Sequence, residues 1–227
     1  MKNTGSMARW AWFSPALAAL FLASASVLPA LAQAGQQQGG GPPDVKAILA
    51  GPAPILSIDR VQAKVSAPLK VTSTAFEANG EIPLRYTSYA ESISPALSWS
   101  AGPAGTKSYA LIFEDATFGM DRKGNLHWMV FNLPAGTTSL AEGASMPAGA
   151  VAACCVPRDS KDGKARYVGP HAPSEAAFKY AYQLFALDTV LALDAKASRE
   201  SLWDAMQGHV LAKGSLTATF QGPAQAK

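Results

Sequence analysis

The chain has 227 residues, with 19 Lys or Arg against 16 Asp or Glu and a formal net charge of +3 at pH 7. Without Lys2 and Arg9, which belong to a leader segment, 17 basic residues face 16 acidic ones. This balance gives no reason to expect binding to nucleic acid or to a membrane surface, and the length suits one domain with a sizeable core.

Residues 1–32 have the pattern of an export signal. Two basic residues precede an uncharged apolar run at 10–27, and Ala30-Leu31-Ala32 supplies the small residues that a signal peptidase accepts. We therefore predict a signal peptide at 1–32 and a periplasmic or secreted product of 195 residues that begins at Gln33. The alternative is a transmembrane anchor, which the two prolines of the leader disfavour.

The next segment, residues 33–44, is rich in Gln, Gly and Pro and has no apolar periodicity. It is predicted to be a disordered tether. A single domain is then expected over residues 45–227. Its first part, residues 45–65, is interpreted as a short helix or an extended arm.

Most of the remaining chain consists of short apolar runs that are typical of β-strands. The runs at 109–113 and 128–133 are almost continuously apolar, which predicts central strands that are covered on both faces. Other strands are expected at residues 69–73, 84–87, 96–100, 166–169, 180–187 and 216–220.

One helix is expected near the end of the chain. Apolar residues recur with helical spacing from Leu202 to Val210, Ser198 is a suitable N-cap, and Gly214 is interpreted as the stop. This helix would place His209 on its apolar face as a core histidine. A single helix among many strands, without β-α-β alternation, favours a packed antiparallel sandwich.

Known catalytic and cofactor motifs are absent from the sequence. It contains no nucleophile elbow, no H-E-x-x-H pair and no glycine-rich phosphate loop, and its three histidines lack the spacing of a zinc site. Cys154 and Cys155 are adjacent, so they cannot link distant segments. A vicinal disulfide, two free thiols and an intermolecular bridge all remain open. We predict no cofactor, no metal and no enzymatic activity.

Polar residues at strand ends are the candidates for a site. Glu114 and Asp115 end an apolar strand, so both must reach solvent or find partners, and Asp115 could meet His127 at the start of a neighbouring strand. His171 lies in a loop that neighbouring Gly and Pro residues restrict. A basic run precedes this loop and would attract anions if it borders a pocket: Arg158, Lys161, Lys164 and Arg166.

The order of several motifs resembles that of the phosphatidylethanolamine-binding (Raf kinase inhibitor-like) family, in its bacterial YbhB/YbcL-type branch. The correspondence runs from about Val71 to Phe220. The motifs that carry it are NGEIPLRY (79–86), SPALSW (94–99), KSYALIFED (107–115), HWMVFNLP (127–134), YVGP (167–170), ALD (186–188), GHVLA (208–212) and GSL (214–216).

The resemblance implies a mainly β fold in which a large antiparallel sheet packs on a smaller one, with a few peripheral helices. It also implies a pocket for a small anion, such as phosphate or a phospholipid headgroup. Asp115 and His127 match the first aspartate and histidine of that pocket. Gly169 and Pro173 match its loop, in which His171 also lies, and Tyr180 matches a tyrosine of the following strand.

The chain also departs from the family pattern. The run that follows Asp115 lacks the second acid and both prolines, the loop at 169–173 reads GPHAP, and Phe178 stands where a histidine is expected. We expect a non-enzymatic binding protein for a small phosphate-containing or other anionic ligand. The alternatives are a protein-interaction module, such as a protease or kinase inhibitor with a vestigial pocket, and an enzyme that uses His127 and Asp115 as an acid–base pair. The natural ligand and the oligomeric state are not predicted.

Overall fold

The computed structural model describes residues 44–65, 68–157 and 159–224. The predicted signal peptide, the tether up to residue 43 and Arg158 lie outside this part of the chain. The elements in chain order are α1 (Val45–Ala50), α2 (Ser57–Arg60), β1 (Val71–Ser73), a 3-10 helix η1 (Leu84–Tyr86), β2 (Leu97–Trp99), β3 (Ser108–Asp115), β4 (Leu126–Pro134), β5 (Ser139–Leu140), β6 (Val151–Cys154), β7 (Phe178–Leu187), α3 (Arg199–Met206) and β8 (Val210–Phe220).

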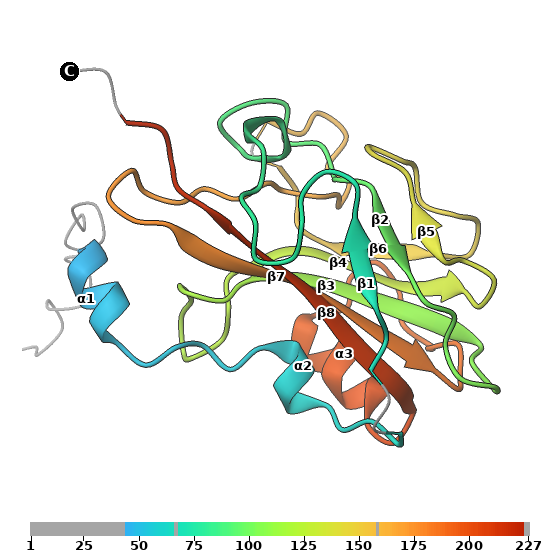
Figure 1. Ribbon diagram of the computed structural model, residues 1–227. Coiled ribbons are helices and arrows are strands. Elements are labelled where there is room, and N and C mark those ends of the chain that lie inside the picture. The colour runs from blue at the N-terminus through green and yellow to red at the C-terminus, as the bar shows by residue number, and fades with distance from the viewer. Residues whose placement is uncertain (1–43, 66–67, 158, 225–227) are drawn as a thin grey trace, which may run out of the picture. The chain divides into compact units, whose positions relative to one another are not determined.

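The strands form two antiparallel sheets, and the small sheet covers one face of the large one (Figure 1). The large sheet has five strands in the order β6-β4-β3-β7-β8, and the small sheet has three in the order β1-β2-β5. The long strands β7 and β8 pair over nearly their whole lengths. The predicted fold class is confirmed.

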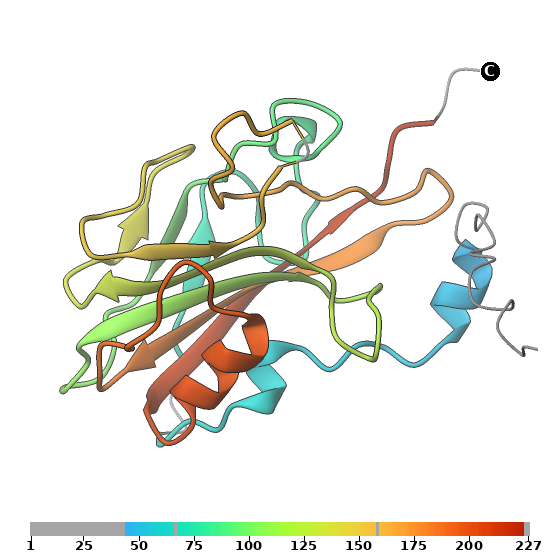
Figure 2. The same cartoon turned by 180° about the vertical axis from the view of Figure 1, so that it is seen from behind.

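Two hydrophobic cores lie on the two faces of the large sheet. One core fills the space between the sheets, and the other lies under α2 and α3, which cover the opposite face (Figure 2). Strand β3 is buried along its whole length. Its residues alternate between the cores: Leu111 and Phe113 pack between the sheets, while Ala110 and Ile112 face the helices. This burial on both faces explains the continuous apolar run in the sequence.

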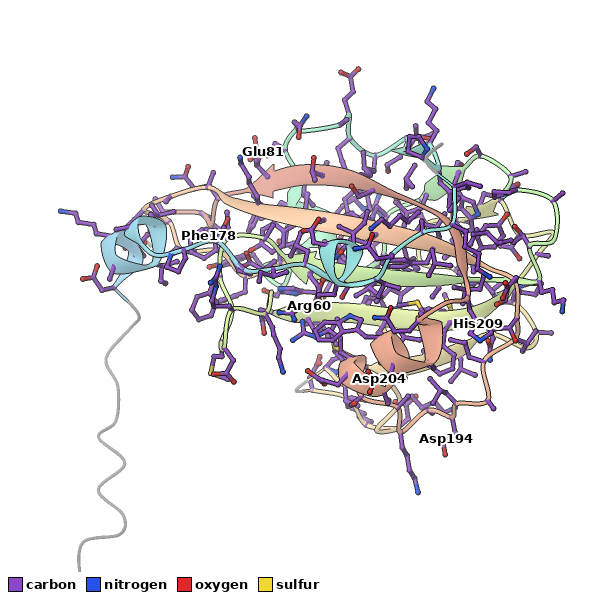
Figure 3. All side chains as sticks on the ribbon, turned by 90° about the horizontal axis from the view of Figure 1, so that it is seen from below. Arg60, Glu81, Phe178, Asp194, Asp204 and His209 are labelled. Carbon is purple, nitrogen blue, oxygen red and sulfur yellow. A yellow bond between two sulfur atoms is a disulfide. The ribbon has the colours of Figure 1, made fainter. Side chains whose placement is uncertain are left out.

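The predicted helix is shorter than expected. Ser198 caps α3, as predicted, but the helix ends at Met206 because Gly208 turns the chain with a φ of 74°. The interpretation of His209 as a core residue was wrong: it lies beyond the helix, and its exposed ring contacts Asp188 (Nδ1 to Oδ1, 2.8 Å) (Figure 3). Gly214 does not end the helix. It lies within β8, where a side chain would collide with the carbonyl group of Leu69.

Two predicted strands are not regular strands. Pro83 leads into a 3-10 turn at Leu84–Tyr86, because the N–H groups of Tyr86 and Thr87 bond back to the carbonyls of Pro83 and Leu84. Residues 166–169 have no regular secondary structure, because the N–H groups of Arg166, Val168 and Gly169 bond to three separate segments and form no ladder. Two short strands, β5 and β6, were not predicted, since two to four residues carry too little periodicity.

The N-terminal arm is attached to the domain through a buried polar network. The carboxylate of Glu114 is fully buried on the helix side of the sheet, where it accepts hydrogen bonds from Ser57 N–H (2.9 Å) and Gln183 Nε2 (2.7 Å). It also pairs with Arg199 of α3 at 2.5 Å. Figure 3 shows Arg60 of α2 on the same side, where its guanidinium lies over the ring of Trp203. One buried carboxylate thus joins α2, α3 and the large sheet.

Candidate functional site

The candidate site contains Asp115 of β3 and Tyr180 of β7, which are neighbouring strands of the large sheet. They are directly opposite each other in the β3–β7 ladder, so both side chains leave the sheet on the face toward the small sheet. Glu114, one residue earlier, points to the helix side. The two adjacent carboxylates at the end of the strand therefore point to opposite faces of the large sheet. Neither is solvated, since Glu114 and Asp115 are 0% and 3% exposed.

A β-bulge brings His127 to the same face. Phe113 pairs with Trp128 and Glu114 pairs with Leu126, so His127 is the extra residue between two regular pairs. Its ring lies 5.4 Å from the ring of Phe113 and 5.5 Å from that of Tyr180. Trp128 packs in the core on this same side. Without the bulge, alternation would send His127 and Trp128 to opposite faces.

Asp115, His127 and Tyr180 form a buried polar cluster. Their exposed fractions are 3%, 5% and 0%. Asp115 Oδ1 accepts hydrogen bonds from the backbone N–H groups of Thr117 (2.7 Å) and Phe118 (2.8 Å). His127 Nδ1 lies 3.0 Å from the carbonyl oxygen of Val168. Among the described residues, His127 Nε2 and the Tyr180 hydroxyl have no hydrogen-bond partner of good geometry, although the hydroxyl faces the Asp115 carboxylate.

Burial shifts the pKa of each member of the polar cluster. It raises the pKa of Asp115 to about 6, although the N–H groups of Phe118 and Thr117 favour the ionised form. It lowers the pKa of His127 to about 4, because the charged ring would lose its hydration. Burial and then the nearby Asp115 charge raise the pKa of Tyr180, which stays a neutral hydroxyl. At neutral pH the cluster holds a carboxylate, a neutral imidazole and a phenol.

The loop at 169–173 borders the polar cluster. Gly169 donates its N–H to Ser92 Oγ (2.8 Å), and a Cβ there would lie 2.5 Å from the Tyr86 carbonyl oxygen. Residue 169 must therefore be glycine for this close approach. The ring of His171 is exposed and stacks on Tyr89 with 4.6 Å between ring centroids; its Nδ1 lies 2.8 Å from Ser88 Oγ.

The structure thus joins only some of the predicted site residues. It brings Asp115, His127 and Tyr180 together, with Gly169 beside them. His171 lies at the exposed rim, close enough to influence the His127 charge. Pro173 makes no polar contact with the three side chains; its carbonyl accepts the N–H of Gly222 instead.

Several contributors to the site were missed from the sequence. They are the backbone amides that hold Asp115, the Val168 carbonyl, and the side chains of Tyr89 and Ser92. Backbone groups have no sequence signal. Tyr89 and Ser92 come from a loop far away in the chain, and only the fold places it beside residues 169–172.

Comparison with known proteins identifies the family. Residues 72–221 match the model of the family described as phosphatidylethanolamine-binding protein. The chain belongs to this family. A relative from Methanothermobacter thermautotrophicus, designated UPF0098, is 39% identical over 154 residues, which cover 67% of this chain and 99% of the relative. The resemblance inferred from the motifs is confirmed, and α1 and α2 precede the matched segment.

Solved structures agree with this assignment. A phosphatidylethanolamine-binding protein homologue, CT736 from Chlamydia trachomatis, is 33% identical and superposes with a TM-score of 0.59, covering 70% of this chain and all of that one. The Escherichia coli protein YbcL shares the fold at 24% identity, with a TM-score of 0.59 over 69% of this chain and all of YbcL.

A further sequence relative, described as lipoprotein LppC, from Mycobacterium tuberculosis, is 29% identical over 163 residues, which cover 70% of this chain and 76% of the relative.

Phe178 marks the departure from the family pattern at the site. It lies two residues before Tyr180 on β7, so its side chain leaves the strand on the same face. It is 3% exposed and is opposite Phe220 of β8. The position that would carry an imidazole is therefore filled by apolar surface, which offers no hydrogen bond to a ligand.

Residues of the basic run line a cleft that does not include the polar cluster. A half-open cleft of about 430 Å³ is lined by Lys164, Arg166 and Tyr167 together with Trp128 and residues 92–94 and 143–146. Arg166 pairs with Asp162 of the same loop. Tyr167 separates this cleft from the polar cluster, because its ring stacks on Phe113 at 5.5 Å. Lys164 and Arg166 therefore line this cleft, and the described residues of the basic run make no hydrogen bond or ion pair with the cluster.

The two cysteines form a disulfide with each other at the end of β6. Of the alternatives that the sequence left open, the structure has the vicinal bridge. In the described ranges, no group of His, Cys, Asp and Glu residues has a metal-binding arrangement. No helix of the described chain is both long and apolar enough to cross a bilayer.

Proposed function

We propose that this protein binds a small ligand through a phosphate or similar anionic group, held by the polar cluster, without catalysing a reaction on it. The observation that carries the proposal is that His127 Nε2 and the Tyr180 hydroxyl are buried beside a buried carboxylate and, among the described residues, have no hydrogen-bond partner of good geometry. Buried polar groups are normally hydrogen-bonded, and leaving one unpaired costs about 1–3 kcal/mol. A bound ligand would satisfy both groups.

The family supports the class of ligand. The family is named for phosphatidylethanolamine, a lipid that carries a phosphate. The side chains also include no nucleophile paired with a base, which supports binding without turnover.

Binding of inorganic phosphate, measured calorimetrically at pH 6, tests this function. Tyr180→Phe and His127→Ala should each weaken binding, by about tenfold or more, because each removes one hydrogen bond to a charged group. Thr189→Ala, a change at a half-buried position outside the cluster, should not alter it. No binding to the unaltered protein would reject the proposal and favour a protein partner. Hydrolysis of an ester panel that disappears in His127→Ala would show catalysis instead.

We also propose that the protein is exported and acts in the periplasm or outside the cell. The proposal rests on the signal-peptide pattern of residues 1–32 and on the relative that is described as a lipoprotein. The intact mass of the protein from a periplasmic fraction should correspond to a chain that begins at Gln33. Recovery of the uncleaved chain in the membrane fraction would contradict this proposal.

A further inference from the structure

The cleft beside the basic run lies at one edge of the sandwich, apart from the polar cluster. Strands β5 and β6 are the edge strands of the small and the large sheet, and they lie on the same side of the molecule (Figure 1 and Figure 2). The cleft is lined by the connection between them at 143–146, by Ala152 of β6, by Trp128 of β4, and by residues of the loops at 92–94 and 162–167. Its volume of about 430 Å³ is within the usual range of small-molecule sites.

Hydrogen bonds hold the loops around this cleft in place. The N–H of Gly143 donates to the carbonyl of Ser94 (2.9 Å), and the N–H of Gly169 donates to Ser92 Oγ (2.8 Å). The hydroxyl of Tyr167 donates to a backbone carbonyl of η1 (2.8 Å). The walls of the cleft are therefore fixed by the protein itself, as is usual for sites that bind small molecules.

The floor of the cleft is apolar and aromatic. The rings of Trp128 and Tyr167 meet edge to face, with 5.6 Å between centroids and an angle of 88°. Half-buried apolar side chains that pack against the core lie beside them, namely Ile93, Met146 and Ala152. A flat ring would pack well on this floor, because aromatic pairs gain more than the area they bury.

The rim of the cleft carries a positive charge. Lys164 and Arg166 supply two positive charges and Asp162 supplies one negative charge, which leaves a net charge of +1. The Asp162 carboxylate is held by its own loop, since it pairs with Arg166 and accepts hydrogen bonds from Ser160 Oγ (2.9 Å) and the Lys164 N–H (3.1 Å). In the described part of the chain, the Lys164 ammonium group forms no ion pair. It is available to a ligand.

We propose that this cleft is a second binding site, which takes a small aromatic carboxylic acid in its ionised form. The ring of the ligand packs on Trp128 and Tyr167, and its carboxylate lies toward Lys164. The hydroxyl groups of Ser94 and Ser145, which also line the cleft, are further donors. A monoanion matches the single net charge of the rim. The site is separate from that of the proposed function, because Tyr167 lies between the cleft and the polar cluster.

Three ligands test the proposed chemistry: 3-phenylpropionate, its neutral amide 3-phenylpropionamide, and acetate. Each is titrated calorimetrically into the protein at pH 7. The aromatic carboxylate should bind. The amide should bind about three- to tenfold more weakly, because it lacks the charge that pairs with the exposed cations of the rim. Acetate should show no binding, because it has no ring to pack on the aromatic floor.

Two variants locate the ligand in the cleft. Lys164→Gln should weaken binding of 3-phenylpropionate by about three- to fivefold and leave that of the amide unchanged. Lys161→Gln is the matched control, since Lys161 is an exposed lysine of the same loop that does not line the cleft; it should change neither affinity. Ala144→Phe places a ring in the cleft from a half-buried loop position, so it should abolish binding of both aromatic ligands.

Several outcomes would overturn the proposal. One is no binding of 3-phenylpropionate at millimolar concentration, and another is equal affinity for the carboxylate and the amide. Equal losses in Lys164→Gln and Lys161→Gln would mean that the cleft does not select the charge. Binding that is lost in His127→Ala but kept in Ala144→Phe would place the ligand in the polar cluster instead. Ala144→Phe should still bind phosphate at pH 6 like the unaltered protein, so a failure of this site is distinguishable from a failure of the proposed function.

Discussion

Asp115 of β3 and Tyr180 of β7 are directly opposite each other at the edge where both strands meet the loops, and the bulge in β4 adds His127 to the same face. The site is therefore built from strand ends, and the long hydrogen-bonded ladders of the large sheet fix their relative positions. Three side chains that are separated by up to 65 positions in sequence become neighbours in this way. Rigid strands make such a site more precise than mobile loops would.

The first prediction concerns two opposing titrations. Burial raises the pKa of Asp115 from 3.8 to about 6 and lowers that of His127 from 6.5 to about 4. Between pH 4 and 6 the folded state holds an extra proton at Asp115 and lacks one at His127. As pH rises from about 4 to 6, the unfolded state loses the Asp115 proton before the folded state does, so the Asp115 contribution to the unfolding free energy decreases. As pH falls from about 6.5 to 4, the unfolded state gains a proton at His127 that the folded state does not bind, so the His127 contribution decreases. In the unaltered protein the two effects cancel.

Single replacements should expose each titration. Relative to the unaltered protein, the unfolding free energy of Asp115→Asn should rise by about 2–3 kcal/mol from pH 4 to 6, and that of His127→Asn should fall by a similar amount. Urea denaturation at pH 4, 5, 6 and 7 measures both. Difference curves that stay flat would mean that the two groups have ordinary pKa values in the folded protein.

The fold was largely predictable from the sequence, and the site only in part. Continuous apolar runs and family motifs placed every end of β3, β4 and β7 within two residues, because burial on both faces leaves an unambiguous pattern. His209 was misplaced because helical spacing continued past Gly208 into the first residue of β8. The bulge at His127 leaves no trace in the periodicity, so the residues alone left a contact between His127 and Asp115 as one of two possibilities, and the resemblance favoured it.

The second prediction concerns the buried ion pair between Arg199 and Glu114. Arg199→Met should lower the unfolding free energy by about 3–5 kcal/mol, because it leaves the fully buried Glu114 carboxylate without a countercharge. Lys123→Met is the control, since it breaks the exposed Lys123–Glu200 pair and should cost less than about 1 kcal/mol. Guanidinium denaturation of both variants measures the difference. Equal losses would show that Glu114 is not effectively buried.

The third prediction concerns Gly169. Gly169→Ala would place a Cβ 2.5 Å from the Tyr86 carbonyl oxygen and 2.6 Å from Thr87, so the backbone must shift. We expect a loss of about 1–3 kcal/mol in unfolding free energy, and weaker phosphate binding as the neighbouring Val168 carbonyl moves away from His127. Gly136→Ala adds a methyl group where no atom lies within 4 Å and should change stability by less than about 0.5 kcal/mol. A stable Gly169→Ala variant with unchanged binding would contradict the prediction.

The last prediction concerns Phe178, which shares a face of β7 with Tyr180. Phe178→His would add a hydrogen-bond donor beside the polar cluster, on the face toward a bound anion. A hydrogen bond between charged groups is worth about 1.5–3 kcal/mol, which corresponds to roughly ten- to hundredfold tighter phosphate binding. The gain should be larger at pH 6 than at pH 8, because the charge of the bound anion opposes the desolvation that keeps a buried imidazole neutral and so favours its protonated form at the lower pH.

Calorimetric titration of phosphate into Phe178→His and Phe178→Leu at both pH values measures this effect. The leucine variant removes the aromatic ring without adding a donor, so it should leave phosphate affinity close to that of the unaltered protein. If both variants bind phosphate equally tightly, the gain comes from space and not from a hydrogen bond. If neither differs from the unaltered protein, residue 178 does not contact the anion, and the ligand is held by Asp115, His127 and Tyr180 alone.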